Sequence, residues 1–145
     1  MKRSLSLIVA LLCLASAQCG WTIPETRPGI DDPETFGVTG TWKWVRSIGG
    51  FGGNDLRTPE TVGYSRTIRF RDDGMFETFR NGTLQEVDHY TITRRSAIWH
   101  SRWRIDFRSF RIAQAIFEVT ADTLRLADDI TDGYGHDYSR VREEP

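Results

Sequence analysis

The chain has 145 residues, which suits one domain with a single hydrophobic core. It carries 19 basic and 20 acidic residues, a formal net charge of −1. This balance argues against a nucleic-acid partner, because proteins that bind nucleic acid present an excess of Lys and Arg to the phosphates.

Residues 1–19 have the pattern of an export signal. Lys2 and Arg3 are followed by an apolar run from Leu5 to Ala15 and then by small residues. The run is far shorter than the roughly 20 apolar residues that cross a bilayer, and no later stretch is long enough either. We therefore predict an exported protein without a transmembrane helix.

Two ways of processing this signal place the protein differently. Ala15-Ser16-Ala17 fits ordinary cleavage, whereas Ser16-Ala17-Gln18-Cys19 resembles the bacterial lipobox, from which Gln18 departs. Cys13 would leave with the signal, so Cys19 would have no cysteine partner in the mature chain. We predict a periplasmic or outer-membrane protein whose only membrane contact is a lipid on Cys19, with a soluble protein as the alternative.

The remainder of the chain divides into a linker and a β-domain. Residues 20–39 contain Pro24, Pro28 and Pro33 with little apolar periodicity, which predicts a flexible linker. Residues 40–142 show short alternating runs separated by turn signals such as Asp73-Gly74 and Asn81-Gly82. Eight strands are predicted, at 40–48, 64–71, 75–80, 83–94, 99–107, 112–120, 123–128 and 137–142. An eight-stranded meander of this kind closes into an all-β, antiparallel up-and-down barrel.

The alternation also predicts which side chains point into the barrel. It is clearest at 99–107, where one face carries Trp99, Ser101, Trp103, Ile105 and Phe107. The same parity places Trp42, Trp44 and Arg46 inside, together with Tyr64, Arg66, Leu84 and Tyr90. Residues 49–63 are predicted to form a long Gly-rich loop, on which Phe51 is a candidate lid over the barrel.

Two short motifs resemble those of the lipocalins. Gly40-Thr41-Trp42 at the first strand resembles the Gly-x-Trp signature of that family, and Arg140 in the last strand stands where its conserved arginine packs over the tryptophan. The resemblance implies a bacterial lipocalin-like barrel in which Trp42 and Arg140 close one end by a cation–π contact. No long helix is predicted after the last strand, so the resemblance implies a shorter barrel than that of the large lipocalins.

Two functions are compatible with these residues. The first is binding of a small apolar ligand, for which the expected contacts are Trp44, Phe51, Tyr64, Arg66, Trp99, Trp103 and Phe107. The second is a filled barrel that acts as an interaction or accessory module through the outward arginines Arg102, Arg104 and Arg108. The three histidines lie on separate elements without metal-ligand spacing, and no catalytic motif is present. We therefore expect no enzyme, no cofactor and no metal.

Overall fold

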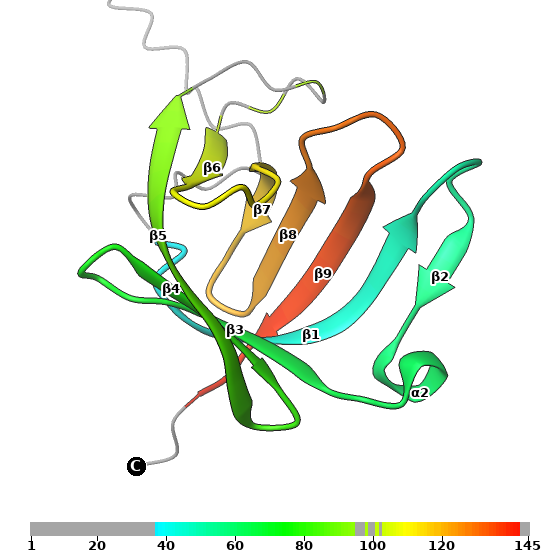
Figure 1. Ribbon diagram of the computed structural model, residues 1–145, viewed down its shortest axis with the longest axis horizontal. Helices are drawn as coiled ribbons and strands as arrows, with labels where there is room; N and C mark the ends of the chain where they lie inside the picture. The colour runs from blue at the N-terminus through cyan, green and yellow to red at the C-terminus, as the bar shows by residue number, and fades with distance from the viewer. Residues whose placement is uncertain (1–36, 95–97, 99–100, 102, 143–145) are drawn as a thin grey trace, which may run out of the picture.

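The computed structural model describes residues 37–94, 98, 101 and 103–142. Cys19, Trp99, Arg102 and the predicted export signal lie outside the described residues. The elements, shown in Figure 1, are β1 (Gly40–Gly49), β2 (Asp55–Arg57), α2 (Pro59–Val62), β3 (Arg66–Phe70), β4 (Met75–Arg80), β5 (Thr83–Arg94), β6 (Trp103–Phe107), β7 (Gln114–Val119), β8 (Thr123–Asp128) and β9 (Tyr134–Arg140).

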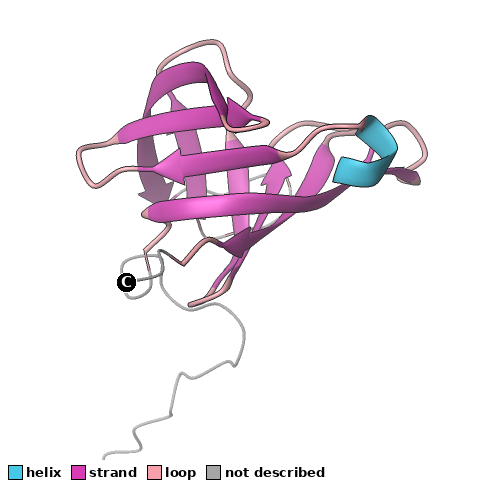
Figure 2. Ribbon diagram, turned by 90° about the horizontal axis from the view of Figure 1, so that it is seen from below, coloured by secondary structure: helices cyan, strands magenta, loops and turns pink. Residues whose placement is uncertain are grey.

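The strands form a closed antiparallel barrel, as the sequence predicts. Consecutive strands from β3 to β9 pair with one another, β1 pairs with β3, and β9 pairs with β1 to close the ring. Eight strands thus make the ring, and β2 extends β1 as a small hairpin beyond it. Figure 2 shows the strands wrapped around a common interior, with α2 at one edge.

The bounds of β4, β5 and β8 agree with the predicted strands. The prediction that residues 49–63 form only a loop is wrong, because this stretch contains a strand and a short helix. Asp55–Arg57 pairs with Ser47–Gly49, which makes β2. Thr58 then caps α2 by accepting a hydrogen bond from the Thr61 backbone N–H, and Pro59 supplies the fixed φ suited to a first helical position.

The predicted turn before β9 is also too long. Tyr134 and Gly135 belong to β9, because they pair with Gly49 and Ile48 of β1. Residues 37–39, assigned to the flexible linker, pack on the barrel: Val38 is buried, and its carbonyl accepts a 2.7 Å hydrogen bond from the Trp42 indole N–H.

Bulges overturn two of the predicted inward positions. The pairing of β1 with β9 shifts between Trp44 and Arg46, so Ser47 points inward and Arg46 outward, where its Nε lies 2.6 Å from Asp137 Oδ2. The pairing of β4 with β5 shifts after Thr78, and Leu84 is half-exposed. A bulge adds one residue to a strand and exchanges its two faces, which alternation alone does not reveal.

Large apolar side chains fill much of the interior. Phe76 lies at the centre of an aromatic cluster, with its ring centroid 4.9 Å from those of both Phe70 and Phe107. The buried hydrophobic residues come from the inward faces of the strands: Trp42, Trp44, Ile68, Phe70, Phe76, Trp103, Ile105, Ile116, Val119, Leu124, Leu126 and Tyr138. Burial of this apolar surface provides the main stabilisation of the barrel.

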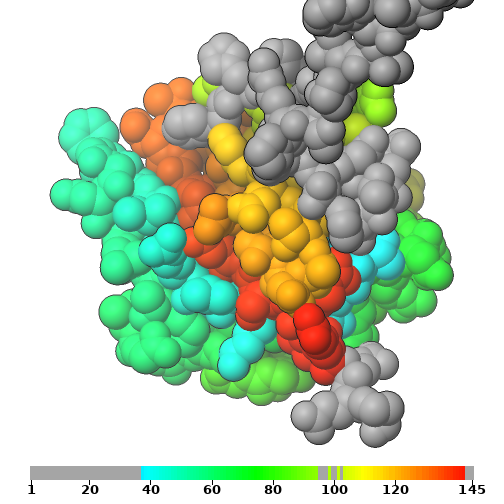
Figure 3. All heavy atoms as spheres, turned by 180° about the vertical axis from the view of Figure 1, so that it is seen from behind, coloured from blue at the N-terminus to red at the C-terminus, as the bar shows by residue number. Residues whose placement is uncertain are grey.

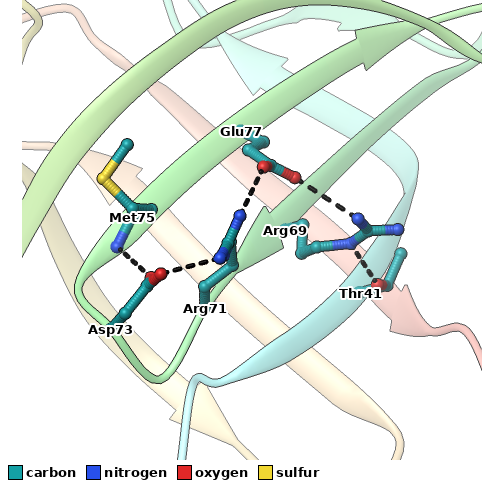
Figure 4. Close-up of polar contacts among 6 residues, drawn as sticks. All are labelled: Thr41, Arg69, Arg71, Asp73, Met75 and Glu77. Carbon is teal, nitrogen blue, oxygen red and sulfur yellow. Dashed lines mark hydrogen bonds and ion pairs between the residues drawn. The ribbon is translucent and has the colours of Figure 1, made fainter.

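The outer wall near the β3–β4 turn carries a chain of ion pairs (Figure 4). Glu77 accepts hydrogen bonds from Arg69 and Arg71, both at 3.4 Å, and Arg71 also donates to Asp73 at 2.7 Å. Arg69 Nε donates to the Thr41 hydroxyl at 3.1 Å. The arginines are exposed, so each pair contributes little to stability, but each guanidinium has a carboxylate partner.

Among the described residues, no helix is long and apolar enough to cross a bilayer.

Candidate ligand site in the barrel mouth

Arg140 closes the end of the barrel at which β1 begins. Its Cζ lies 4.0 Å from the centroid of the Trp42 ring, the contact expected from the sequence. The guanidinium also donates to the carbonyl oxygens of Ala121, Thr39 and Gly37 at 2.7, 2.9 and 3.3 Å. Its burial lowers the pKa of Arg140. Arg140 therefore holds three chain segments together over the indole, a structural role.

Gly40 makes this arrangement possible. Its φ of +131° is rarely adopted by residues with a side chain, and a Cβ built at this position would lie 2.5 Å from Arg140 Nη1. The glycine of the Gly-x-Trp triplet thus provides the space for the arginine, and Trp42, two residues later on the inward face, provides the ring beneath it.

The opposite, open end of the interior holds a polar cavity of about 210 Å³. At roughly 30 Å³ per water molecule, this is the volume of about seven waters. The cavity is lined by Arg66, Ile68, Arg111, Ile112, Gln114, Asp128, His136 and Tyr138. Six of these eight residues are polar or carry a hydroxyl, so the cavity differs in character from the apolar core below it.

Arg66 is the strongest indication that the cavity binds something. Its Nη2 donates to the Tyr138 hydroxyl at 3.3 Å, and its Cζ lies 4.8 Å from the centroid of the Trp44 ring. Among the residues that the structure describes, its buried Nε has no hydrogen-bond partner and no carboxylate forms an ion pair with it. A buried donor without an acceptor is costly and rare, so an anionic acceptor in the cavity would complete this site.

Arg111 supplies a second cation at the same mouth. Its Nη1 pairs with Glu86, and its Cζ lies 4.9 Å from the ring centroid of Phe76 and 5.3 Å from that of Phe107. The charge of Arg111 is thus partly neutralised by Glu86, which distinguishes it from Arg66.

A chain of hydrogen bonds runs from the core to the cavity wall. The Trp44 indole N–H donates to Ser47 Oγ at 2.8 Å, and Ser47 Oγ lies 2.7 Å from His136 Nδ1. His136 Nε2 lies 3.2 Å from Asp128 Oδ1, which also accepts from the Gln114 amide at 3.2 Å. A carboxylate can only accept, so the Nε2–H of His136 donates to Asp128, and the unprotonated Nδ1 accepts from the Ser47 hydroxyl. The tautomer of His136 with its hydrogen on Nε2 therefore satisfies every hydrogen bond in the chain.

This chain has the Ser–His–Asp order of hydrolases, but its geometry serves another purpose. Ser47 is buried, does not line the cavity, and already accepts the Trp44 N–H. A nucleophile must be presented to a substrate. Ser47 instead fixes the ring of His136, and His136 and Asp128 are the members of the chain that face the cavity.

The hydrogen bonds to Asp128 predict a stability change in acid. Burial acts to raise the pKa of this carboxyl, but hydrogen bonds from His136, Gln114 and the Tyr134 backbone outweigh burial and hold the pKa below the ordinary 3.8. A lowered pKa stabilises the fold above pH 3.8, and this stabilisation is lost as the pH falls through the folded-state value. We expect Asp128→Asn to cost about 1–3 kcal/mol of unfolding free energy at pH 7.

The measurement is urea unfolding of the wild type and of Asp128→Asn at pH 7 and pH 3. We expect the difference in unfolding free energy between the two proteins to be smaller at pH 3. Asp88→Asn is the matched comparison. Burial acts to raise the pKa of Asp88, but hydrogen bonds from Ser109 and from backbone N–H groups outweigh it and lower the pKa, and Asp88 is not part of the cavity lining. A difference for Asp128→Asn that is the same at both pH values would contradict the interpretation.

The β1–β2 hairpin is fastened beside the mouth by Tyr134. The Tyr134 hydroxyl donates to Asp55 Oδ2 at 2.6 Å and accepts from Arg57 Nη2 at 2.8 Å. The Asp55 carboxyl has a lowered pKa because of the hydrogen bonds from Tyr134 and Arg57. Gly50 passes close to this hydroxyl, since a Cβ there would lie 3.0 Å from it.

The residues predicted to bind a ligand are only partly brought together. Trp44 and Tyr64 stack with centroids 6.3 Å apart, and Arg66 lies over Trp44. Phe107 lies beneath Arg111. Trp103 is buried in the core, with Arg94 over its ring. Phe51 is 95% exposed on its loop and lines neither the cavity nor its wall.

The sequence reasoning missed the polar half of the site. His136 and Tyr138 alternate with Tyr134 along β9. The predicted strand 137–142 included Tyr138 but began one residue after His136, and Tyr134 was assigned to the preceding turn, so the inward position of His136 was missed. Ser47 was missed because of the β1 bulge. Arg111, Gln114 and Asp128 come from three different elements, and only the closed barrel brings them to one mouth.

A larger hollow of about 840 Å³ lies on the outer wall, on the face formed by β7, β8 and β9 beside the β1–β2 hairpin (Figure 3). Its charged residues include Arg46 with Asp137, and Arg125 with Glu118, and these pair with one another at 2.6 and 2.8 Å. None of the residues that line the hollow is among those with a buried, unpartnered side-chain donor in the described part of the chain, which distinguishes the hollow from the mouth.

No group of three His, Cys, Asp or Glu side chains within the described ranges is placed to hold a metal ion. The closed eight-stranded barrel is consistent with a calycin-like fold. Comparisons with protein-family models, with curated proteins and with solved structures found no match for this chain.

Proposed function

We propose that this barrel is a binding protein that holds the anionic group of one small ligand in its open mouth. The observation that carries the proposal is Arg66, whose buried Nε lacks an acceptor and whose guanidinium lacks a carboxylate partner among the described residues. Every outer-wall arginine described above is paired instead. An ionised acceptor at this position would form charge-assisted hydrogen bonds.

The cavity sets the size and shape of such a ligand. About 210 Å³ admits a small molecule but not a long acyl chain or a large planar group. The Tyr138 ring lies 5.8 Å from the Arg66 Cζ, and Tyr138, Ile68 and Ile112 of the cavity lining offer apolar surface to the rest of the ligand. The expectation of a wholly apolar ligand is therefore replaced by a small carboxylate with an aromatic or aliphatic body.

The proposal includes the place of the protein in the cell. The export signal and Cys19 support a lipocalin-like protein of the bacterial cell envelope, held by a lipid on that cysteine. The barrel and the Trp42–Arg140 contact support the lipocalin-like description, which remains part of this proposal.

Isothermal titration calorimetry with benzoate and the neutral, similarly shaped benzamide tests the proposal. We expect benzoate to bind and benzamide to bind at least about tenfold more weakly, since a hydrogen bond to a charged group is worth about 1.5–3 kcal/mol. Acetate and inorganic phosphate in the same assay show whether the body of the ligand or the charge alone suffices. Equal affinities for benzoate and benzamide would contradict an anion site.

The second candidate is a filled barrel that serves as an accessory module for another protein. The tightly packed core of buried aromatic rings favours it, because little of the interior is left for a guest. Failure of every anion to bind, together with native mass spectrometry showing no retained ligand in protein from its own host, would favour this candidate.

A further inference from the structure

Exposed hydrophobic side chains gather at the open end of the barrel. In an up-and-down barrel, the loops after β1, β4, β6 and β8 all lie at one end, and Figure 1 shows the β1–β2 and β8–β9 loops projecting to the same side. Each of these connections carries at least one large exposed hydrophobic residue in the loop or beside it: Phe51, Leu84, Phe110, Ile112 and Ile130. Phe51 and Phe110 are almost completely exposed.

The turns at the closed end have a different character. The β3–β4 turn contains Asp72 and Asp73, and the β7–β8 turn contains Asp122. Neither turn carries a large exposed hydrophobic residue, and Val141, after β9, is the one that the structure describes near this end. The exposed Ile98 lies elsewhere, because its backbone N–H donates to Asp129 in the β8–β9 loop at 2.9 Å. The two ends of the barrel therefore present different surfaces to their surroundings.

We propose that the open end docks on a lipid surface, with Phe51 and Phe110 inserting among the headgroups. Exposed phenylalanines at loop tips cost solvation energy unless they are covered. Because these side chains stand on separate loops around a polar mouth, they do not form the continuous apolar patch that packs against a protein. They suit a fluid interface, into which each ring inserts independently.

Two arginines near the loops suit a lipid partner with anionic headgroups, beside one exposed carboxylate, Asp132, in the β8–β9 loop. Arg108 lies two residues before Phe110, is exposed, and forms no ion pair with any residue that the structure describes. Arg80, the last residue of β4, contacts the Tyr64 ring at 4.0 Å and likewise forms no ion pair among those residues. Basic residues near a surface of anionic lipid contribute about 1 kcal/mol each. This membrane contact is separate from a lipid on Cys19.

The test is co-sedimentation of the full chain carrying Cys19→Ala with vesicles of phosphatidylcholine and phosphatidylglycerol. All variants compared carry the same residues 1–19, so any vesicle binding by this segment is equal among them. We expect Phe51→Ala and Phe110→Ala each to weaken partitioning about tenfold. Val45→Ala and Val87→Ala are the matched controls, since both valines are half-exposed on the outer wall, away from the loops, and should leave partitioning unchanged.

Two further measurements make the test decisive. Arg108→Gln should weaken binding to mixed vesicles but not to vesicles of phosphatidylcholine alone, which separates attraction to anionic headgroups from ring insertion. Benzoate affinity should be unchanged in Phe51→Ala, because Phe51 lies outside the cavity lining. Absence of vesicle binding by the Cys19→Ala chain, or equal binding by the phenylalanine and valine variants, would overturn the proposal.

Discussion

Replacement of Trp42 by alanine is expected to lower the free energy of unfolding by about 3–5 kcal/mol, the cost of removing a large aromatic side chain from a packed core. Trp42 is fully buried, donates its indole N–H to the Val38 carbonyl, and lies beneath the Arg140 guanidinium. Its loss would leave a cavity, an acceptor without its donor and a desolvated cation without its ring. Urea unfolding followed by circular dichroism measures the change.

Two control variants separate these contributions. Trp42→Phe keeps most of the apolar contact but lacks the N–H donor, and should fall between the wild type and Trp42→Ala. Val45→Ala, on the outer face of the same strand, should change the unfolding free energy by less than about 1 kcal/mol. A loss below about 1 kcal/mol for Trp42→Ala would mean that the closed end is not a major part of the core.

Arg66→Gln is expected to weaken benzoate binding about 10- to 100-fold, which corresponds to loss of a hydrogen bond between charged groups. Glutamine keeps an amide donor of similar reach but removes the charge. The fold should tolerate the change, because Arg66 makes one long hydrogen bond, at 3.3 Å, and two ring contacts. Calorimetry with benzoate gives the affinity, and urea unfolding verifies that the barrel is intact.

Arg69→Gln is the matched control for this prediction. Arg69 lies three residues further along β3 and points to the outer wall, where it contacts Glu77 and Thr41 (Figure 4). Both substitutions remove one positive charge from the same strand, so a general electrostatic effect would weaken binding in both. Equal losses in the two variants would show that Arg66 does not contact the ligand.

The fold could be predicted from the sequence because its signals are local. Alternation of apolar residues, as in Thr123–Asp128, and glycine turns such as Asp73-Gly74 give strands and hairpins directly. Eight strands joined in this way close into a barrel, and the predicted contact of Arg140 with Trp42 follows from the adjacency of the first and last strands.

The site was less predictable because its residues depend on bulges and on long-range register. Because β1 contains a bulge, Ser47 and not Arg46 points to the inner face of the barrel. The hydrogen bond between Ser47 and His136 depends on this inward position. The alternation correctly predicts that Arg66 lies in the interior. That its Nε lacks an acceptor among the described residues follows only from the positions of the carboxylates in the folded barrel. An unsatisfied donor is a property of the assembled barrel.

The contacts of Arg140 also bear on the order of events in folding. Its hydrogen bonds to Thr39 and Gly37 join residues 101 and 103 positions apart, so they close a loop that contains nearly the whole domain. Closure of so long a loop carries a large entropic cost, and topologies dominated by distant contacts fold slowly. Until β9 emerges and pairs with β1, both neighbouring strands keep exposed edges that favour association with other chains. The last strand therefore completes the barrel and, at the same step, protects the unfinished chain from aggregation.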